Sequence, residues 1–327
     1  MRQTRTLVLT CLLYLAVPVA SFAQAAPQPA AQTTAQQTPF TKELKKTVGL
    51  VTVTYIKDGK SWKDEGTCFF IYYPDERVGK DQGFAYLVTN RHVAVPGIED
   101  GHPYLATSTT LRLNRKDSNT SDEKQMPLGG NLHWYFPADN AVDLAVLPFA
   151  PDQVNYDTKP IPVSMLIKQS EIEPDGISEG DPIVFTGYFY QFPGLQKFEP
   201  IVREGTLAMI PDEQLDTTLR KRGNLYLADV HVAGGNSGSP LLINLGGFRN
   251  GSLDMNMRYK LLGIISGFYH EDSDFTLTVA TTYSGTLQGN SGIATVVPAY
   301  ALKDLLDSPE LQSTRDAYVK SRQGGAQ

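Results

Sequence analysis

The sequence predicts an all-β protein of two six-stranded antiparallel β-barrels with a short C-terminal helix. Three observations lead to this prediction. Short β-branched or aromatic runs recur from Val48 onward, turn-rich stretches separate them, and Ala150-Pro151-Asp152 divides them into two sets of six. The chain has 327 residues, 41% of them hydrophobic, which is enough to fold two cores of ordinary size.

The first set predicts an N-terminal barrel over residues 40–150, and the second set predicts a C-terminal barrel plus terminal helix over residues 151–310. The first six expected strands are Val48–Ile56, Thr67–Tyr73, Phe84–Thr89, Thr110–Leu113, Asn131–Phe136 and Asp143–Phe149. The next six are Pro182–Tyr188, Ile201–Ile210, Leu225–Val232, Pro240–Asn244, Tyr259–Ser266 and Gly292–Val297. Leucines at helical spacing predict a helix over Pro298–Leu306, and the polar tail 311–327 is expected to fray.

The first residues have the layout of a secretory signal peptide. Basic residues precede an apolar run from Leu7 to Ala20, which at 14 residues is too short to cross a bilayer, and small residues follow it. We therefore expect a signal peptide over residues 1–25, cleaved after Ala23 or Ala25. Residues 26–39 are rich in Ala, Gln, Pro and Thr and are expected to form a disordered linker. This layout indicates export, to the bacterial periplasm or the extracellular space.

Charge and cysteine content narrow the function classes. A net charge of −6 argues against non-specific nucleic-acid binding, which needs clustered basic residues. Outside the predicted signal peptide Cys68 is the only cysteine, so internal disulfides are excluded and stability must come from packing. No residue pattern indicates a cofactor or a metal site, and no membrane insertion is expected once the signal peptide is removed.

Three short segments carry the functional prediction: Thr89–Val93, Asp143–Leu147 and Gly234–Pro240. They present a histidine, an aspartate and a serine in that order, each beside a predicted strand. Acyl transfer needs a hydroxyl nucleophile, a base that takes its proton and an acid that orients the base. The glycines around Ser237 allow a tight turn whose amides can face a developing oxyanion.

This arrangement resembles the chymotrypsin-fold (trypsin-like) serine peptidases, and within them the bacterial exported HtrA-type and glutamyl-endopeptidase-like enzymes. The resemblance covers roughly Val48 to Leu306, and the spacings of 51 and 94 residues between the three candidates fit it. The motifs that carry it are Thr67–Ile71 with Tyr86–Val93, Gly180–Tyr188 and Leu262–Ser266. It implies that His92 is the general base, that Asp143 orients it, and that Ser237 is the nucleophile. The alternative interpretations, in which Asp143 and His92 merely cap strand ends, are less favoured.

The resemblance also implies an oxyanion hole made by the amides of Gly235 and Ser237. Asn236 stands where animal zymogens have an aspartate that pairs with a newly cut N-terminus. Asparagine has no charge to attract that ammonium group, so we expect no activation by such a cleavage.

The tetrapeptide Gly-Asn-Ser-Gly occurs twice, at Gly235–Gly238 and at Gly289–Gly292. Only the first is followed by Ser239-Pro240 and a hydrophobic strand. A nucleophile at Ser291 would lie 148 residues after Asp143, with only a helix to follow. Ser291 is therefore expected in a turn, and Gly292 is expected to line the specificity pocket.

The same resemblance suggests further substrate-binding residues. It places His231 at the base of the primary pocket and Ile265, Ser266 and Phe268 on the strand that pairs with substrate. His231 stands where Arg- or Lys-specific enzymes have an acid, and Ile265 stands where Glu-specific enzymes have a histidine, so neither preference is expected. Phe268 would narrow the pocket mouth, which predicts a preference for small or aliphatic residues. Two alternatives stay open: His231 could favour acidic or polar groups, or His231 and Phe268 could merely pack.

Two stretches have competing interpretations. The aromatic run Tyr188–Gly194 could grip an unfolded substrate or a subunit, although half-buried packing is the commoner outcome. The acidic stretch Glu271–Asp274 lacks a full calcium-ligand pattern and is interpreted as a solvated loop.

The leading hypothesis is thus an exported serine endopeptidase that acts on polypeptides through an acyl-enzyme intermediate. The alternative is a catalytically silent module of the same fold that binds unfolded polypeptide. An α/β-hydrolase is excluded, because that fold places its serine before its histidine. Oligomerisation is left open.

Overall fold

The computed structural model describes residues 39–129, 132–278 and 282–324, with side chains outside 275–285. The predicted signal peptide and nearly all of the predicted linker lie outside these residues. Everything described belongs to one compact unit, Thr38–Gln327. None of the described helices is long and apolar enough to cross a membrane.

The N-terminal half forms one sheet of seven strands. Its strands are β1 (Val48–Lys57), β2 (Lys60–Pro74), β3 (Gly83–Thr89), β4 (Ala106–Asn114), β5 (Ser121–Gln125), β6 (Ala145–Pro148) and β7 (Ile161–Pro162). The order is β5-β4-β1-β2-β3-β6, and β7 pairs with β2 in parallel. The predicted closure into a six-stranded barrel was wrong in hydrogen-bonding terms, because the ladder ends at β5 and β6. Strand β5 is charged and mostly exposed, which suits a sheet edge.

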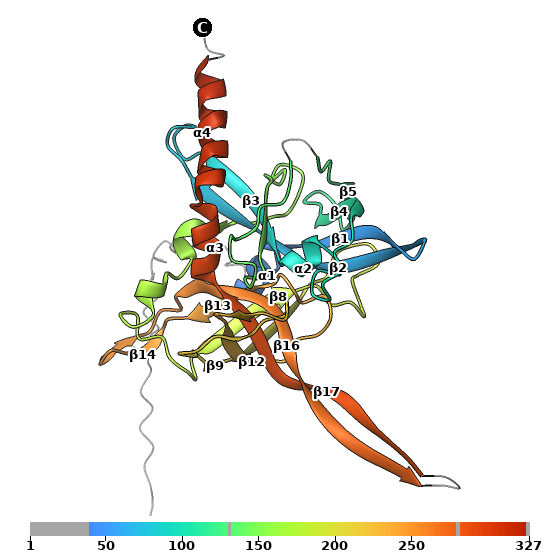
Figure 1. Cartoon of the computed structure of the whole chain (residues 1–327). Helices are drawn as coiled ribbons and strands as arrows, with labels where there is room; N and C mark the ends of the chain where they lie inside the picture. Colours follow the sequence, from blue (N-terminus) through green and yellow to red (C-terminus); the bar gives the residue numbers. More distant parts are fainter. Residues whose placement is uncertain (1–38, 130–131, 279–281, 325–327) are drawn as a thin grey trace, which may run out of the picture. The chain divides into compact units, whose positions relative to one another are not determined.

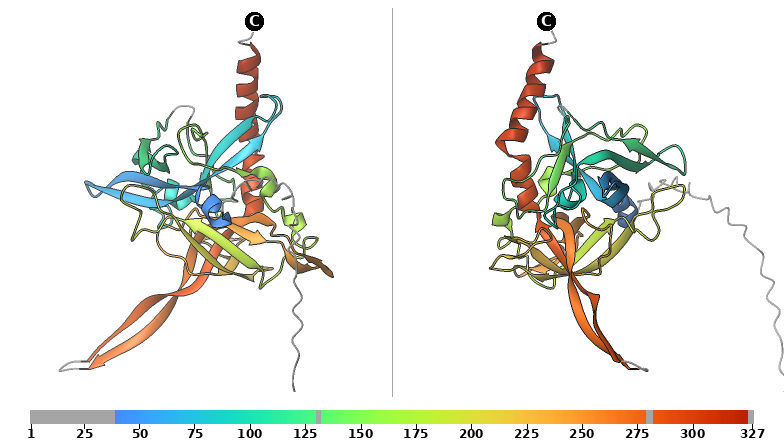
Figure 2. Two further views of the ribbon diagram at one scale, coloured as in Figure 1. Left: turned by 180° about the vertical axis from the view of Figure 1, so that it is seen from behind. Right: turned by 45° about the vertical axis from the view of Figure 1, so that its right-hand side comes forward.

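The C-terminal half forms a closed barrel in the order β12-β17-β16-β13-β8-β9. Its strands are β8 (Pro182–Gly187), β9 (Ile201–Met209), β12 (Tyr226–Asp229), β13 (Pro240–Asn244), β16 (Tyr259–Thr278) and β17 (Thr282–Pro298). The all-β class and this barrel are confirmed. Strands β16 and β17 run far past their predicted ends and leave the barrel as a two-stranded arm (Figures 1 and 2).

Alternation along β2 explains how the two halves are joined. Cys68 and Phe70 point into the core of the first sheet, whereas Phe69 and Ile71 point into a core shared with the second barrel. All four are fully buried, so this part of β2 has no solvent face. The shared core also contains Leu261 and Ile264 of β16, so apolar packing holds the two sheets together.

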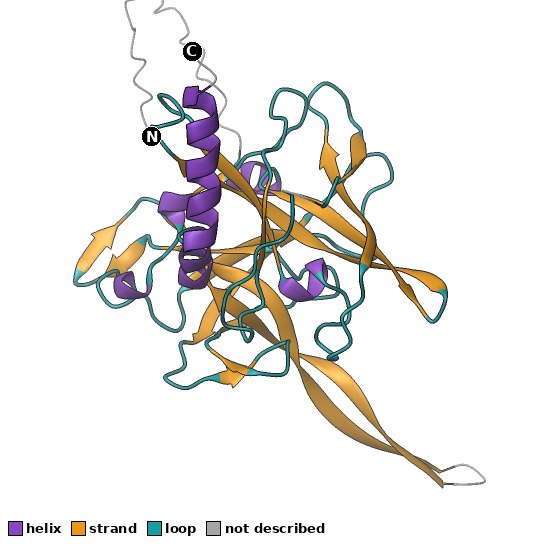
Figure 3. Cartoon of the chain, turned by 45° about the horizontal axis from the view of Figure 1, so that its top comes forward, coloured by secondary structure: helices purple, strands orange, loops and turns teal. Residues whose placement is uncertain are grey.

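Smaller elements complete the described fold (Figure 3). The helices are α1 (Phe40–Lys45), α2 (Arg91–Ala94), α3 (Ala299–Leu306) and α4 (Pro309–Gly324), with 3-10 turns at Val163–Met165 and Gln169–Glu171. Two short hairpins are β10 (Leu215–Asp216) with β11 (Arg222–Gly223), and β14 (Gly247–Arg249) with β15 (Ser252–Asp254). The expected strand Asn131–Phe136 is absent from its described part, where Tyr135 makes only an isolated bridge to Val146.

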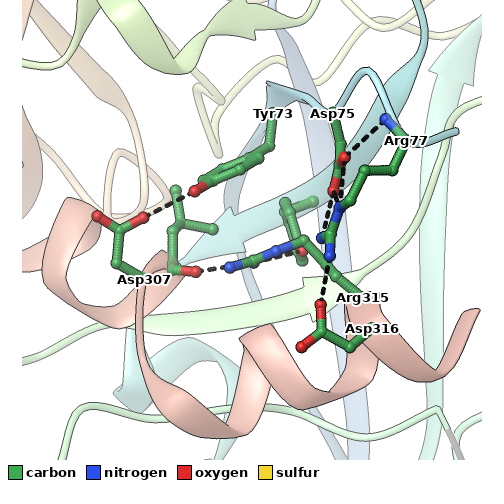
Figure 4. A network of polar contacts seen from close by, with 8 residues as sticks. Tyr73, Asp75, Arg77, Asp307, Arg315 and Asp316 are labelled. Carbon is green, nitrogen blue, oxygen red and sulfur yellow. Dashed lines mark hydrogen bonds and ion pairs between the residues drawn. The ribbon is translucent and has the colours of Figure 1, made fainter. Parts of the chain in front are cut away.

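Helix α4 corrects the expectation that the polar tail frays. It packs against the first sheet through Arg315, which is 4% exposed (Figure 4). The Arg315 guanidinium donates to the Tyr86 hydroxyl at 3.0 Å and to the Leu306 carbonyl at 2.8 Å, and it lies 4.4 Å from the ring centre of Tyr73. An ion pair between Arg77 and Asp316 adds a second tie. Leu311 and Val319, four residues to either side, are buried with it, so the packed face of α4 has a charged residue at its centre.

Candidate active site

His92 and Asp143 are brought together by the pairing of β3 with β6. That ladder aligns Thr89 with Ala145, so the histidine after β3 and the aspartate before β6 emerge at the same end of the sheet. Asn90, fully buried, donates to the Asp143 carbonyl at 2.7 Å and fixes the backbone of the acid. A register set by two strands therefore positions two side chains 51 residues apart.

The His92–Asp143 pair has the geometry of a charge-stabilised imidazole. The Asp143 carboxylate is fully buried and accepts from the His92 amide at 3.0 Å and from His92 Nδ1 at 2.7 Å. Burial alone would lower the pKa of His92, but the charge and hydrogen bond of Asp143 outweigh it and raise that pKa. Burial likewise acts to raise the pKa of Asp143, but the His92 charge and three hydrogen bonds hold it below its usual value. With Nδ1 donating to Asp143, Nε2 is left to accept a proton.

Behind Asp143 lies a hydroxyl chain that the sequence did not indicate. Ser266 Oγ donates to Asp143 Oδ2 at 2.6 Å, and its only hydrogen is thereby used. Thr218 Oγ1, 2.9 Å from Ser266 Oγ, must then be the donor in that contact. Ser266 was predicted as a substrate-binding residue through its strand position, and no spacing signal pointed to its side chain or to Thr218.

Ser237 lies on a tight turn that is pressed against β2. Its carbonyl accepts from the Thr67 amide at 2.9 Å, and a Cβ on Gly238 would lie 2.0 Å from the Thr67 carbonyl oxygen. Gly238 has φ +86°, so only glycine fits there without strain. The Ser237 hydroxyl donates to the Ser266 carbonyl at 3.1 Å rather than to His92.

The turn before Ser237 also requires a glycine at position 235. Gly235 has φ +89°, and a Cβ there would lie 2.5 Å from the Tyr188 ring. Within the described part of the chain, the amides of Gly235 and Ser237 donate no hydrogen bond. Asn236 is fully buried, donates to the Tyr188 carbonyl at 2.7 Å and accepts from the Ala233 amide at 2.8 Å. The uncharged Asn236 side chain therefore holds the turn through two hydrogen bonds, at the position where animal zymogens have an aspartate.

His92 and Ser237 line the same open cavity of about 610 Å³. Gly234, Gly235 and Tyr188 form one wall. Three carboxylates and one lysine line the remainder: Lys63, Asp64, Glu65 and Glu99. The structure thus brings together the three predicted catalytic residues and the two predicted oxyanion-hole residues around one cavity.

The other predicted substrate-binding residues are distributed differently. Ile265 is buried, and its amide and carbonyl pair with Ser239 and Gly238, so it supports the strand and offers no group to the cavity. Phe268 packs on the core of the second barrel, and His231 is exposed on a loop outside the cavity lining. Packing of Phe268 was one of the open alternatives.

Ser291 and Gly292 lie at the base of the arm. The predicted turn at Ser291 was wrong: the residue lies inside β17 and donates to the Tyr269 carbonyl at 2.8 Å. The Gly292 carbonyl accepts from the Val230 amide, in the segment that leads to the nucleophile turn. Glu271–Asp274 lie in β16 rather than in the predicted loop.

Two further groups bear on the chemistry. Among the described residues no cluster of His, Cys, Asp and Glu could hold a metal ion. Cys68 is fully buried, and burial raises the pKa of its thiol far above the usual range. The Cys68 thiol therefore keeps its proton, and Ser237 is the serine that lines the cavity.

Comparison with known proteins gives one match that covers more than half of the chain. Residues 66–247 match the family model of the trypsin-like peptidase domain, a range that contains His92, Asp143 and Ser237. No curated protein matches the sequence.

Solved structures give weaker likenesses. The HtrA-type protease AlgW with a decapeptide is 16% identical with a TM-score of 0.45, over 82% of this chain and 66% of that chain. The Rv3671c protease of M. tuberculosis H37Rv, in an inactive form, is 17% identical with a TM-score of 0.41, over 87% and 96% of the two chains. This chain thus spans just under two thirds of AlgW. Likenesses at this level say nothing about substrate or assembly.

Proposed function

Because this chain belongs to the trypsin-like peptidase family, we propose that it is an exported serine endopeptidase that cleaves polypeptides with Ser237, His92 and Asp143. The observation that carries the proposal is the His92–Asp143 pair. His92 Nδ1 lies 2.7 Å from Asp143 Oδ2, and His92 lines the same cavity as Ser237. The family match supports the peptidase class. The roles of the individual residues and the export step are our inference from geometry and sequence.

The proposed reaction begins when His92 Nε2 takes the Ser237 proton and Oγ attacks the scissile carbonyl. The carbonyl oxygen becomes an oxyanion, which the amides of Gly235 and Ser237 are free to bind. Expulsion of the amine, protonated by His92, leaves an acyl-enzyme on Ser237. Water then repeats the sequence and releases the acid. Each oxyanion-hole donor of this kind contributes about 3 kcal/mol to the barrier reduction.

Substrate binding would also free the nucleophile. The Ser237 hydroxyl now donates to the Ser266 carbonyl, on the strand that the family resemblance pairs with substrate. A substrate amide that donates to this carbonyl would replace the serine as donor. Ser237 Oγ could then rotate toward His92 Nε2, since catalytic hydrogen bonds often tighten only in the complex.

Active-site labelling tests the proposal. A fluorophosphonate probe should label the purified exported chain on Ser237, and mass spectrometry should locate the adduct. Labelling should disappear in Ser237→Ala and persist in Ser291→Ala. Labelling of Ser291, or none in a folded protein that still binds unfolded polypeptide, would instead support the silent binding module.

The export part of the proposal has its own test. Fractionation of cells that produce the full chain should place it outside the cytoplasm, with a new N-terminus after Ala23 or Ala25. An intact N-terminus on a cytoplasmic protein would contradict it.

A further inference from the structure

The strand that carries Ser266 has an open edge from the active site outward. Strand β13 pairs with β16 only as far as Ile264, and Ile265 is then held by Ser239 and Gly238. From Ser266 to Thr278, β16 has β17 on one side and no described strand on the other. The Ser266 carbonyl, which faces Ser237, thus begins a free edge that continues along the arm.

The arm is long and its base is fixed. Pairing runs from His270–Asn290 to Thr278–Thr282, nine residue pairs, or about 27 Å at strand spacing. At the base, Asn290 Nδ2 donates to the Val232 carbonyl at 2.6 Å, and the Gly292 carbonyl accepts from the Val230 amide. These two hydrogen bonds tie the base of the arm to the segment that precedes the nucleophile turn, and the arm extends away from the barrel (Figure 1).

Among the described residues, the arm consists of two strands without a third. A two-stranded ribbon is only marginally stable alone in water, so this geometry calls for a partner.

The charge of the arm narrows the class of partner that it can bind. Glu271, Asp272 and Asp274 are exposed at the proximal end of the arm, and the sequence has no Lys or Arg between Tyr269 and Ser291. An acidic arm is repelled by anionic lipid surfaces and by a second copy of this chain, which carries a net charge of −6. It attracts a cationic polypeptide.

The resemblance already implies that substrate pairs with Ser266–Phe268. We propose that the arm extends this docking edge: residues further upstream of the scissile bond continue as an added strand along β16, from His270 outward. This inference rests on the proposed function, and its subject lies outside the family match, which ends at residue 247. Backbone pairing supplies affinity, and the exposed carboxylates of Glu271, Asp272 and Asp274 supply side-chain selectivity. Counting outward from Ser266, the acidic residues meet substrate positions about six to nine residues before the scissile bond.

A peptide series tests the inference. A core peptide, chosen from a cleavage profile, is made in three forms: alone, with eight residues added before it, and with the same eight added after it. The added residues are apolar, with two lysines at the sixth and seventh positions before the bond. We expect kcat/KM to rise on the order of tenfold for the upstream extension alone, mainly through KM. The gain should shrink as salt increases.

Two variants separate the arm from the rest of the protein. In the first, residues 273–287 are replaced by Asn-Gly, which joins the paired positions Asp272 and Gln288 by a tight turn. In the second, Glu271→Lys with Asp272→Lys reverses two exposed charges without changing the fold. The matched control is Glu76→Lys with Glu173→Lys, two exposed acids on other loops. The first variant should cleave all three peptides equally, the second should lose the lysine preference, and the control should match the unaltered protein.

Each outcome decides something. A gain that survives arm shortening, or that the downstream extension reproduces, overturns the inference. If arm shortening lowers the molar mass measured by light scattering and lowers cleavage of all three peptides equally, the arm makes contacts between copies. If arm shortening abolishes binding to phosphatidylcholine vesicles without changing peptide cleavage, the arm contacts a membrane. If no peptide is cut but Ser237→Ala binds the upstream-extended peptide only when the arm is present, the proposed function fails and the docking edge stands. Absence of both cleavage and binding defeats both.

Discussion

Two copies of one tetrapeptide lie in this chain, and their surroundings differ completely. Gly235-Asn236-Ser237-Gly238 forms a tight turn with φ +89° and +86° at its glycines. Gly289-Asn290-Ser291-Gly292 continues strand β17, where a single bulge with φ +83° at Gly292 interrupts the ladder. Identical letters therefore take two backbone conformations.

The two serines consequently differ in what they can reach. Ser237 lines the cavity with His92, whereas Ser291 is held by the Tyr269 carbonyl and accepts from the Ile293 amide at 3.2 Å. The side-chain amides of both asparagines donate to a backbone carbonyl, but Asn236 is fully buried whereas Asn290 is half-buried. A nucleophile is thus defined by its base and its free amides, and the local sequence motif alone does not make one.

The sharpest test of this contrast is the pair of serine variants. Ser237→Ala should lower kcat by about 10⁴- to 10⁶-fold, because nothing else in the cavity can form the acyl-enzyme. Ser291→Ala should stay within about twofold of the unaltered enzyme in steady-state cleavage of a fluorogenic peptide. Equal losses in both variants would show that the second tetrapeptide takes part in the chemistry.

The next largest difference is expected when the first glycine of each tetrapeptide is replaced by alanine. Gly235→Ala places a methyl group at φ +89° and 2.5 Å from the Tyr188 ring, so the amide must move. We expect about 10²- to 10³-fold lower kcat and a lower Tm, with cooperative unfolding retained. A Cβ on Gly289 would meet nothing nearer than the Glu271 carbonyl at 3.6 Å, so Gly289→Ala should be nearly silent. Unchanged turnover in Gly235→Ala would remove its amide from the oxyanion hole.

The two asparagines should differ in stability. Asn236→Ala leaves the buried Tyr188 carbonyl and the Ala233 amide without partners, which costs about 1–3 kcal/mol for each group. Asn290→Ala also removes two hydrogen bonds, but water can reach that site, so less than about 1 kcal/mol is expected. Urea unfolding of both variants measures the difference. Equal losses would mean that burial of Asn236 is unimportant.

The smallest effect concerns the hydroxyl chain behind the base. Since the pKa of His92 is raised, kcat/KM should fall as pH drops through a value above 6.5, where the imidazole becomes protonated. Ser266→Ala removes a hydrogen-bond donor to Asp143, so the carboxylate binds protonated His92 more strongly. The low-pH limb of the kcat/KM profile should therefore move to higher pH. Thr218→Val should shift it less, in the same direction. If the low-pH limb of kcat/KM does not move in either variant, these residues have only a packing role.

Strands that bury a face were largely predictable from sequence, and β13 was predicted to the residue. Their β-branched alternation follows from packing against the two cores. The arm escaped prediction because its acidic proximal half resembles a solvated loop, and cross-strand pairing rather than burial defines it. Helix α4 escaped because its buried stripe, Leu311, Arg315 and Val319, has a charged residue at its centre.

Chain order and local glycines were enough to expect that His92, Asp143, Ser237 and Gly235 lie close together, and their catalytic roles stay a prediction. The candidate site was not predictable where a contact depends on strand register. Ser266 reaches Asp143 over 123 residues, and Ile265, one position earlier, is locked into the barrel. A shift of one residue along a strand exchanges such roles, and only the folded register fixes it.

The anchor of α4 also joins segments that are synthesised at different times. Tyr86 of the first sheet receives its hydrogen bond from Arg315, which is synthesised 229 residues later. At about 5 to 20 residues per second, a ribosome needs roughly 10 to 45 seconds to cover that distance. During that interval the first sheet forms without this hydrogen bond and without the contact of Arg315 with the Tyr73 ring.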